Sequence, residues 1–232
     1  MNERPKAISQ TQRAAQLVGP GAVLATVFLM IVPLPPFVLD ILLSVDIGLA
    51  VVLLLTAIYI RQPIELTALP SILLLLTMFR LALNVASTRL ILLNGADGID
   101  SAGQVIMAFG QYVVGANFIV GIVVFLVLIA IQFIVINHGA VRISEVTARF
   151  TLDALPGKQM SIDSDLNAGM IDESEARSRR RQLAAEAEFY GAMDGASRFT
   201  QRDAVASILI TAINIVAGFL IGVFQHGMPL KR

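Results

Sequence analysis

Residues 118–136 read FIVGIVVFLVLIAIQFIVI, an apolar run without a single charged side chain. A helix that crosses the hydrocarbon core of a bilayer needs roughly 20 predominantly apolar residues. The run, taken together with the short residues just before it, therefore predicts a transmembrane helix at about residues 116–136.

The whole chain has the composition of a membrane protein. It is 56% apolar and 15% charged, and its mean hydropathy is +0.77. Soluble domains are nearer half apolar and a quarter charged. The absence of cysteine excludes disulfides and thiolate metal sites, and His138 and His226 do not form a ligand-spaced pair. The net charge of zero indicates no nucleic-acid partner.

Four further apolar runs have about the length of a span, at 21–35, 37–60, 69–93 and 204–224. A cluster of prolines after residue 32 separates the first two, because proline cannot continue a helix. Residues 104–115 are expected to form a short interfacial helix. We therefore expect an all-α integral membrane protein with about five transmembrane helices and a mostly helical cytosolic loop.

The basic residues that flank the spans predict the orientation. The N-terminal tail carries three Lys or Arg residues, the turn at 61–68 one, the loop at 138–203 nine and the loop at 94–103 none. This places the tail and the long loop in the cytoplasm and identifies the first span as an uncleaved anchor. The predicted domains are the tail 1–19, four spans within 20–137, the loop 138–203, the fifth span within 204–226 and a short end 227–232.

Within the long loop, residues 142–170 are rich in turn formers and charges. Asp172 followed by Glu175 resembles a capping box, which predicts that a helix begins there. We expect that helix to run to about residue 190. Gly191 and Gly195 should then loosen the chain before the fifth span.

Charged side chains inside predicted spans are the first candidates for function. Arg80 lies near the centre of its span, where an arginine costs at least about 2.5–3.5 kcal/mol unless it faces protein or water. Arg89 lies nearer the end and can snorkel. Asp40 and Asp46 lie in the second span, and burial of either carboxyl would suit it to bind and release a proton. A structural ion pair between Arg80 and one of these aspartates is the alternative.

Two other patterns are candidates. The charges of residues 142–165 predict either an ordered ion-pair network or a solvated linker, in which surface pairs contribute little. Asn214, Gly218 and Gly222 form a face for close helix packing in the fifth span.

The sequence contains no complete motif for catalysis or metal binding. The acidic run that begins at Asp163 carries Ala168 and Ser174 where a calcium loop needs glycine and glutamate. Gly157-Lys158 lacks the rest of a phosphate loop. We expect no enzymatic activity, no cofactor and no metal site.

Four blocks of the sequence carry a family resemblance. Residues 142–165 read RISEVTARFTLDALPGKQMSIDSD, and the supporting blocks are FRLALNVASTRLIL at 79–92, FYGAMDGASRF at 189–199 and QHGM at 225–228. Together they resemble the FHIPEP family, the large export-gate proteins of type III secretion in bacterial flagella and virulence injectisomes. Residues 84–88, 165–169 and 189–191 are more similar to the flagellar branch.

The resemblance implies a subunit that couples the proton-motive force to export of unfolded flagellar proteins across the inner membrane. It implies a nonameric ring that contacts other export-gate membrane proteins of the basal body. It also implies a further cytosolic domain, absent from this chain, that binds the export ATPase complex and chaperone–substrate complexes. By matching positions it assigns energy coupling to Asp40, Arg80, Arg89, Arg142, Arg149, Asp153, Lys158, Asp194 and Asp203.

Three alternatives remain open from the sequence. The first is the injectisome homologue, which would export virulence effectors. The second is a secondary transporter or ion channel, although the paired repeats typical of transporters are not seen. The third is a purely structural ring scaffold.

Overall fold

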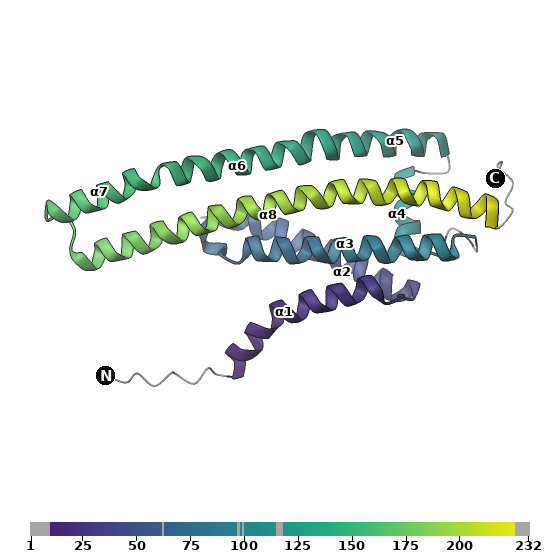
Figure 1. Cartoon of the computed structure of the whole chain (residues 1–232), viewed down its shortest axis with the longest axis horizontal. Helices are drawn as coiled ribbons and strands as arrows, with labels where there is room; N and C mark the ends of the chain where they lie inside the picture. Colours follow the sequence, from purple (N-terminus) through teal and green to yellow (C-terminus); the bar gives the residue numbers. More distant parts are fainter. Residues whose placement is uncertain (1–9, 62, 97, 99, 115–117, 226–232) are drawn as a thin grey trace.

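The structure is a computed structural model that describes residues 10–61, 63–96, 98, 100–114 and 118–225. The described chain is built from helices and contains no β-strand (Figure 1). The helices are α1 Gln10–Ile31, α2 Pro36–Tyr59, α3 Leu69–Asn94, α4 Gln104–Val114, α5 Phe118–Ala130, α6 His138–Asp153, α7 Leu155–Asn167 and α8 Glu173–Leu220. A 3-10 helix at Pro63–Leu66 and π-helical turns at Ile131–Asn137 and Ile221–Gln225 complete the set.

The long helices alternate in direction along the molecule. α1, α3 and α8 run one way, and α2 and the α5–α7 segment run the other way (Figure 1). Among the described residues, four helices are long and apolar enough to cross a membrane, and Gly19–Ile31 adds a shorter apolar helix. The expected all-α membrane fold is therefore confirmed.

Helices α2 and α3 match the predicted spans at 37–60 and 69–93 closely. α1 differs from its prediction, since it begins at Gln10, inside the expected polar tail, and ends at Ile31. The proline cluster explains the end: Pro35 and Pro36 instead begin α2, where a first-turn proline needs no hydrogen-bond donor.

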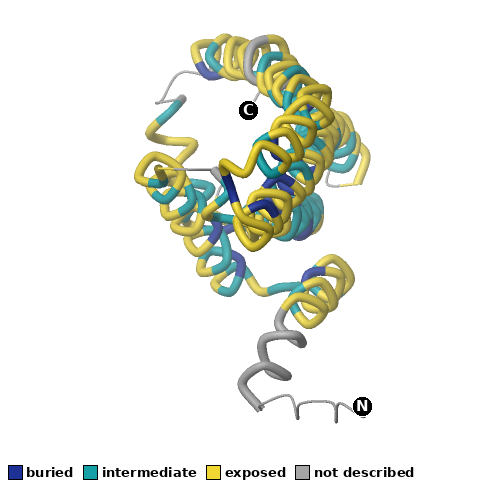
Figure 2. Tube along the Cα trace, turned by 90° about the vertical axis from the view of Figure 1, so that its left-hand side faces the viewer, coloured by how far each residue is buried: buried dark blue, intermediate teal, exposed yellow. Residues whose placement is uncertain are grey.

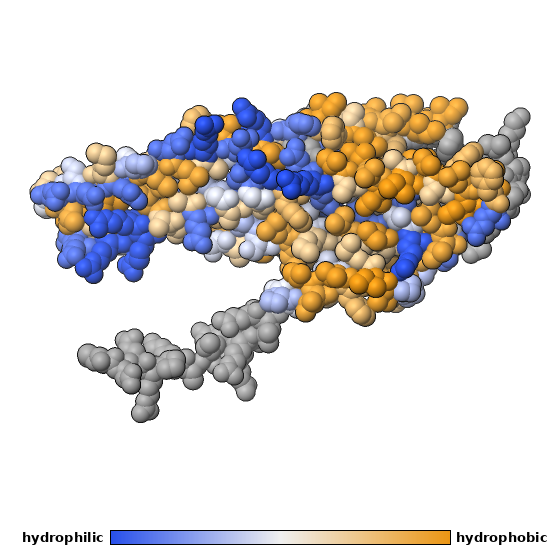
Figure 3. All heavy atoms as spheres, in the orientation of Figure 1, coloured by the Kyte–Doolittle hydropathy of each residue, from blue (hydrophilic) through white to orange (hydrophobic). Residues whose placement is uncertain are grey.

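A long hairpin dominates the fold. Residues Ile119–Asn167 form 49 helical residues in almost unbroken succession, and α8 returns beside them. With 48 residues, α8 is about 72 Å long at 1.5 Å per residue. The polar half of the hairpin projects from the apolar block of spans (Figure 3).

Two predictions about this region were wrong. Residues 142–170 are not a turn-rich segment, because Pro156 occupies the first turn of α7, where proline is tolerated. Gly191 and Gly195 do not loosen the chain, because α8 runs through both. A glycine costs a helix interior about 1 kcal/mol, and the contacts that α8 makes along its length outweigh that cost.

The predicted start of α8 is confirmed. Asp172 Oδ1 accepts a hydrogen bond from the Glu175 backbone N–H at 2.7 Å. This bond and a second one from the Ser174 hydroxyl hold the pKa of Asp172 below its usual range. The Glu175 side chain binds Arg179 instead of completing the capping box.

Burial in the described chain is sparse, as expected of spans that face lipid (Figure 2). One buried cluster joins α2 to α3 through Leu39, Leu83, Ala86 and Leu90. A second cluster lies at the far end of the hairpin, and its buried members are Ile162, Ile171, Ala176 and Leu183. The apolar surface left over is far larger than a soluble monomer exposes.

Candidate functional site

Helices α3 and α8 lie side by side and parallel, and polar side chains line their contact. Thr77 and Thr200 bring their hydroxyl oxygens to 3.3 Å. Two further contacts follow along the helices, each between residues separated by nearly the same distance in the sequence as Thr77 and Thr200. Asn84 Nδ2 lies 2.9 Å from Ser207 Oγ, and Asn214 Nδ2 lies 3.0 Å from Thr88 Oγ1. We call this line of contacts the α3–α8 seam. Polar pairs between membrane helices hold them in one register.

The centre of the seam is charged. Arg80 Nε lies 3.5 Å from Asp46 Oδ2, and Asp46 is only 8% exposed. Asp203 on α8 interacts electrostatically with both residues. Arg80 therefore does form the ion pair that was the structural alternative, and its partner is Asp46 and not Asp40. This triad, Asp46, Arg80 and Asp203, gathers one cation and two carboxyl groups from three helices.

Ion pairs connect the two arms of the hairpin beyond the spans. Lys158 Nζ on α7 lies 3.2 Å from Glu186 on α8. Closer to the triad, Arg198 binds Asp194 Oδ2 at 2.9 Å and lies 3.7 Å from Glu145 on α6. The hydrogen bond and charge of Asp194 raise the pKa of Arg198. The network interpretation of the loop charges therefore holds for Glu145 and Lys158, and Asp194 of α8 joins the same network.

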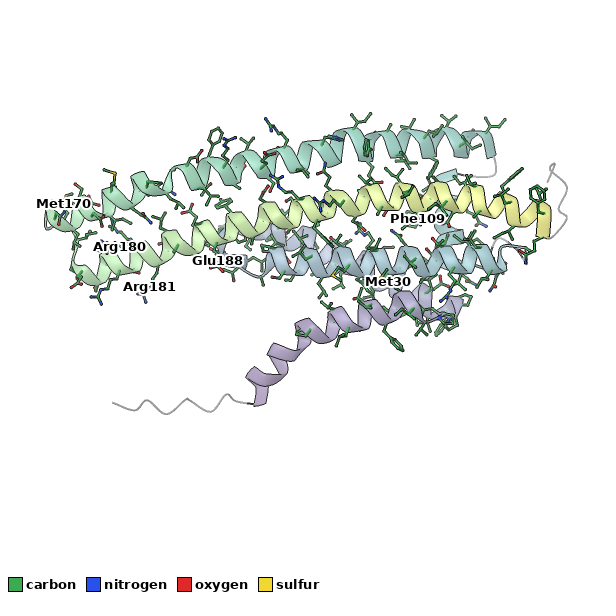
Figure 4. All side chains as sticks on the ribbon, viewed as in Figure 1. Met30, Phe109, Met170, Arg180, Arg181 and Glu188 are labelled. Carbon is green, nitrogen blue, oxygen red and sulfur yellow. The ribbon has the colours of Figure 1, made fainter. Side chains whose placement is uncertain are left out.

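Further ion pairs connect the two arms at the tip of the hairpin. Arg179 Nη1 lies 3.4 Å from Asp165, and Arg180 pairs with Asp163. Arg180 accordingly points toward α7, whereas Arg181 points away from it, and Met170 marks the turn at the tip (Figure 4). All of these pairs are exposed enough for water to weaken them individually.

Three of the predicted loop residues make no ion pair with α8 of their own, and only Arg142 touches this network, through Glu145. Arg142, Arg149 and Asp153 lie on the outer surface of α6, with side chains 75%, 78% and 72% exposed. Their described ion pairs are local, from Arg142 to Glu145 and from Arg149 to Asp153. For these residues the structure supports the solvated interpretation.

Asp40 and Arg89 lie at the opposite end of the spans and bind helix termini. The Asp40 carboxylate accepts hydrogen bonds from the backbone N–H groups of Gln104, at 2.9 Å, and Val105, at 3.0 Å. A carboxylate there satisfies free donors and complements the dipole of α4. Arg89 Nη1 donates to the carbonyl of Ile31, the last residue of α1, at 2.8 Å. The geometry therefore separates these two residues from the triad.

The predicted packing face of the fifth span meets α3. Asn214 binds Thr88, and a side chain built on Gly218 would approach Leu92 to 3.9 Å. Gly218 and Gly222 line a cavity of about 220 Å³ between the two helices, together with Gly95.

Sequence reasoning missed several seam and hairpin residues: Thr77, Asn84, Thr88, Glu186, Thr200 and Ser207. A signal did exist for the seam, because Thr77 and Asn84 on α3, like Thr200 and Ser207 on α8, are seven residues apart and so share one helix face. No comparable signal marks Glu186, whose partner Lys158 is distant in the sequence.

The arrangement suits charge movement more than bond chemistry. The described residues contain no cluster of three or more metal-ligating side chains. Buried carboxyl groups beside a guanidinium can exchange protons and change ion pairs without any cofactor.

Spans that carry charged groups at their contacts and continue as an ion-paired hairpin define an integral membrane protein with an intramembrane charge site. Comparison with known proteins then gives the particular family: the chain belongs to the FHIPEP family, whose model matches residues 26–232.

Curated relatives of the chain are flagellar proteins. It is 54% identical over 214 residues to the flagellar biosynthesis protein FlhA of Escherichia coli K12, which covers 92% of the chain and 31% of that protein. It is 52% identical over 209 residues to FlhA of Helicobacter pylori J99, covering 90% and 28%. It is 51% identical over 228 residues to the putative flagellar export/assembly protein LfhA of E. coli O44:H18, covering 98% and 33%. The chain thus spans about a third of the length of these relatives, and no solved structure matches it.

Proposed function

We propose that the chain forms the membrane part of an export-gate subunit of the flagellar type III secretion apparatus. Its relatives named for flagellar biosynthesis and export support this assignment. The subunit lies in the bacterial inner membrane with its N-terminus and the hairpin tip in the cytoplasm. It is not an enzyme, and it assembles with copies of itself as a nonameric ring beside other export-gate membrane proteins. The export ATPase complex and chaperone–substrate complexes bind a further cytosolic domain.

The triad is the observation that carries a proton-coupled mechanism. A proton that binds Asp203 or Asp46 removes one of two carboxylate charges facing Arg80, which changes the balance of forces between α2, α3 and α8. One charge that crosses 100 mV releases about 2.3 kcal/mol, enough to shift such a balance.

The continuity of α8 links the triad to the hairpin. Asp203 is five residues from Arg198, or about 7.5 Å along one rigid helix. A movement of α8 at the triad therefore reaches the Arg198–Asp194–Glu145 contacts directly. The hairpin passes that movement to the export machinery in the cytoplasm.

The first test is secretion of hook and filament proteins by a strain that lacks the gene for this protein. We expect both to disappear from the medium and to return when the intact gene is restored. Normal secretion without the gene would refute the flagellar role, and loss of virulence-effector secretion instead would favour the injectisome homologue.

The second test concerns coupling. Asp203→Asn and Asp194→Asn in the intact gene should reduce secretion while the protein remains in the membrane in normal amount. Glu173→Gln, at the exposed tip of α8, is the control and should secrete normally. Normal secretion by both aspartate variants would leave a purely structural scaffold as the better account.

A further inference from the structure

Three acceptor atoms of the triad and the α3–α8 seam are buried and receive no hydrogen bond from any described residue. They are Asp46 Oδ1, Asp203 Oδ1 and Asn214 Oδ1. Buried polar atoms are almost always paired, so an unpaired carboxyl or amide oxygen requires a physical reason. Two of them lie on α8 in the seam and the third lies on α2 beside it, and all three are available to accept hydrogen bonds from polar groups other than protein.

The spacing of the seam residues suits water. From Asp203, the polar residues Ser207, Thr211 and Asn214 follow on α8 at intervals of three or four residues, about one helical turn or 5.4 Å. Two hydrogen bonds of about 2.8 Å placed end to end cover the same distance. The spacing therefore leaves room for one water molecule between successive side chains of α8, with Asn84 and Thr88 of α3 as the facing residues.

The seam has an open end away from the hairpin. The cavity of about 220 Å³ lined by Gly95, Ala96, Gly218 and Gly222 begins one turn beyond Asn214. A water molecule takes about 30 Å³ in the liquid, so this cavity has room for several. The unpaired oxygen of Asn214 lies between this cavity and the remainder of the seam.

We propose that the α3–α8 seam is a hydrated path that conducts protons from this cavity, past Asn214, Thr88, Asn84 and Ser207, to Asp203. The proposal rests on the proposed function and names the route by which the coupling proton enters. A proton that joins the outermost water displaces one from the next, and the last proton forms the O–H bond of the Asp203 carboxyl group. The carboxyl group later releases it on the cytoplasmic side, past the Thr77–Thr200 contact, so that no group is consumed.

Helix cohesion alone does not account for the same residues. The Asn84–Ser207 and Asn214–Thr88 hydrogen bonds hold the two helices together, but the second uses only Asn214 Nδ2 and leaves Asn214 Oδ1 unpaired. Apolar residues in place of the remaining oxygens would avoid a desolvation cost. Polar residues in unbroken succession from an open cavity to a buried carboxyl group are what a proton path requires.

Proton flux tests the path. Everted membrane vesicles from cells that produce the intact protein are loaded with a pH-sensitive dye, and flux is measured after a proton gradient is imposed. Thr88→Val and Ser207→Ala remove one seam hydroxyl each and should lower flux by about tenfold, the effect of ~1.4 kcal/mol on a rate. Thr88→Ser and Ser207→Thr keep the hydroxyl and should restore flux.

Thr26→Val is the matched control. Thr26 is a buried span threonine whose hydroxyl donates to the Ala22 carbonyl of its own helix, away from the seam. It should leave flux unchanged. Wild-type flux in Thr88→Val and Ser207→Ala, with the protein present in normal amount, would overturn the proposal.

Ala96→Leu decides the matter if the seam variants fail to accumulate. It narrows the cavity and leaves every polar seam residue in place. If the seam conducts protons, this variant should lower the proton flux, and if the seam is only structural, the flux should not change. The outcomes separate the proton path from the proposed export function. If secretion requires the gene but continues in variants without proton flux, the path is refuted and the export function stands.

Discussion

Replacing Gly103 with alanine tests the contact by which Asp40 holds the start of α4. Gly103 has a φ of +116°, which side-chain-bearing residues rarely adopt, and a Cβ there would lie 2.5 Å from Asp40 Oδ1. The backbone strain alone costs about 1–3 kcal/mol. Displacing the carboxylate from the Gln104 and Val105 amides costs about 1 kcal/mol more, the usual value of a helix cap.

The expected loss is therefore roughly 2–4 kcal/mol of local stability in α4. Amide hydrogen exchange over Gln104–Val114, measured by mass spectrometry on the protein in lipid nanodiscs, reports it directly. A loss of about 2 kcal/mol corresponds to exchange about thirtyfold faster.

Gly110→Ala is the control within the same helix. Gly110 has nothing within 4 Å of a built Cβ, so alanine should stabilise α4 by about 0.5–1 kcal/mol and slow exchange. If Gly103→Ala leaves exchange unchanged while Gly110→Ala slows it, Asp40 does not hold α4 and its charge is free for another role.

Three further predictions follow from the hairpin and the triad. Arg80→Leu leaves the Asp46 charge buried without its partner and should destabilise the protein by about 3 kcal/mol in thermal unfolding. Adding Asp46→Leu should recover most of that loss. If the effects of the two substitutions on stability are fully additive, the two residues are not an ion pair. Gly191→Ala and Gly195→Ala should each stabilise α8 by about 0.5–1 kcal/mol, because both sites are open and helical, and a decrease in the unfolding temperature would indicate a break in the helix. The pKa of Asp172 is lowered in the folded protein, so its carboxylate stabilises the start of α8 at every pH above its ordinary pKa of 3.8. This stabilisation is lost as the pH falls through the lowered pKa. The amide chemical shift of the residue it caps should follow that titration, and Asp172→Asn should abolish the pH dependence.

Local patterns were predictable, and the reason is physical. The start of α8 depends on groups within one turn, and the pairs that link residues 173 to 177 and 175 to 179 depend only on helix geometry. Breaks in helices were less predictable, because proline and glycine propensities are small compared with packing. Pro156, Gly191 and Gly195 each look like an end of a helix, and each lies inside one.

By itself, the sequence determined that this protein is a bundle of membrane-spanning helices, because the free energy of placing a segment in lipid is a sum over its own residues. It also marked Arg80, Asp40 and Asp46 as charges inside predicted spans, where a charged side chain requires a partner or a function. Only the tertiary structure decided which partners they have. Arg80 pairs with Asp46 and interacts electrostatically with Asp203, whereas Asp40 binds the start of α4. These choices depend on how helices distant in the sequence lie against one another.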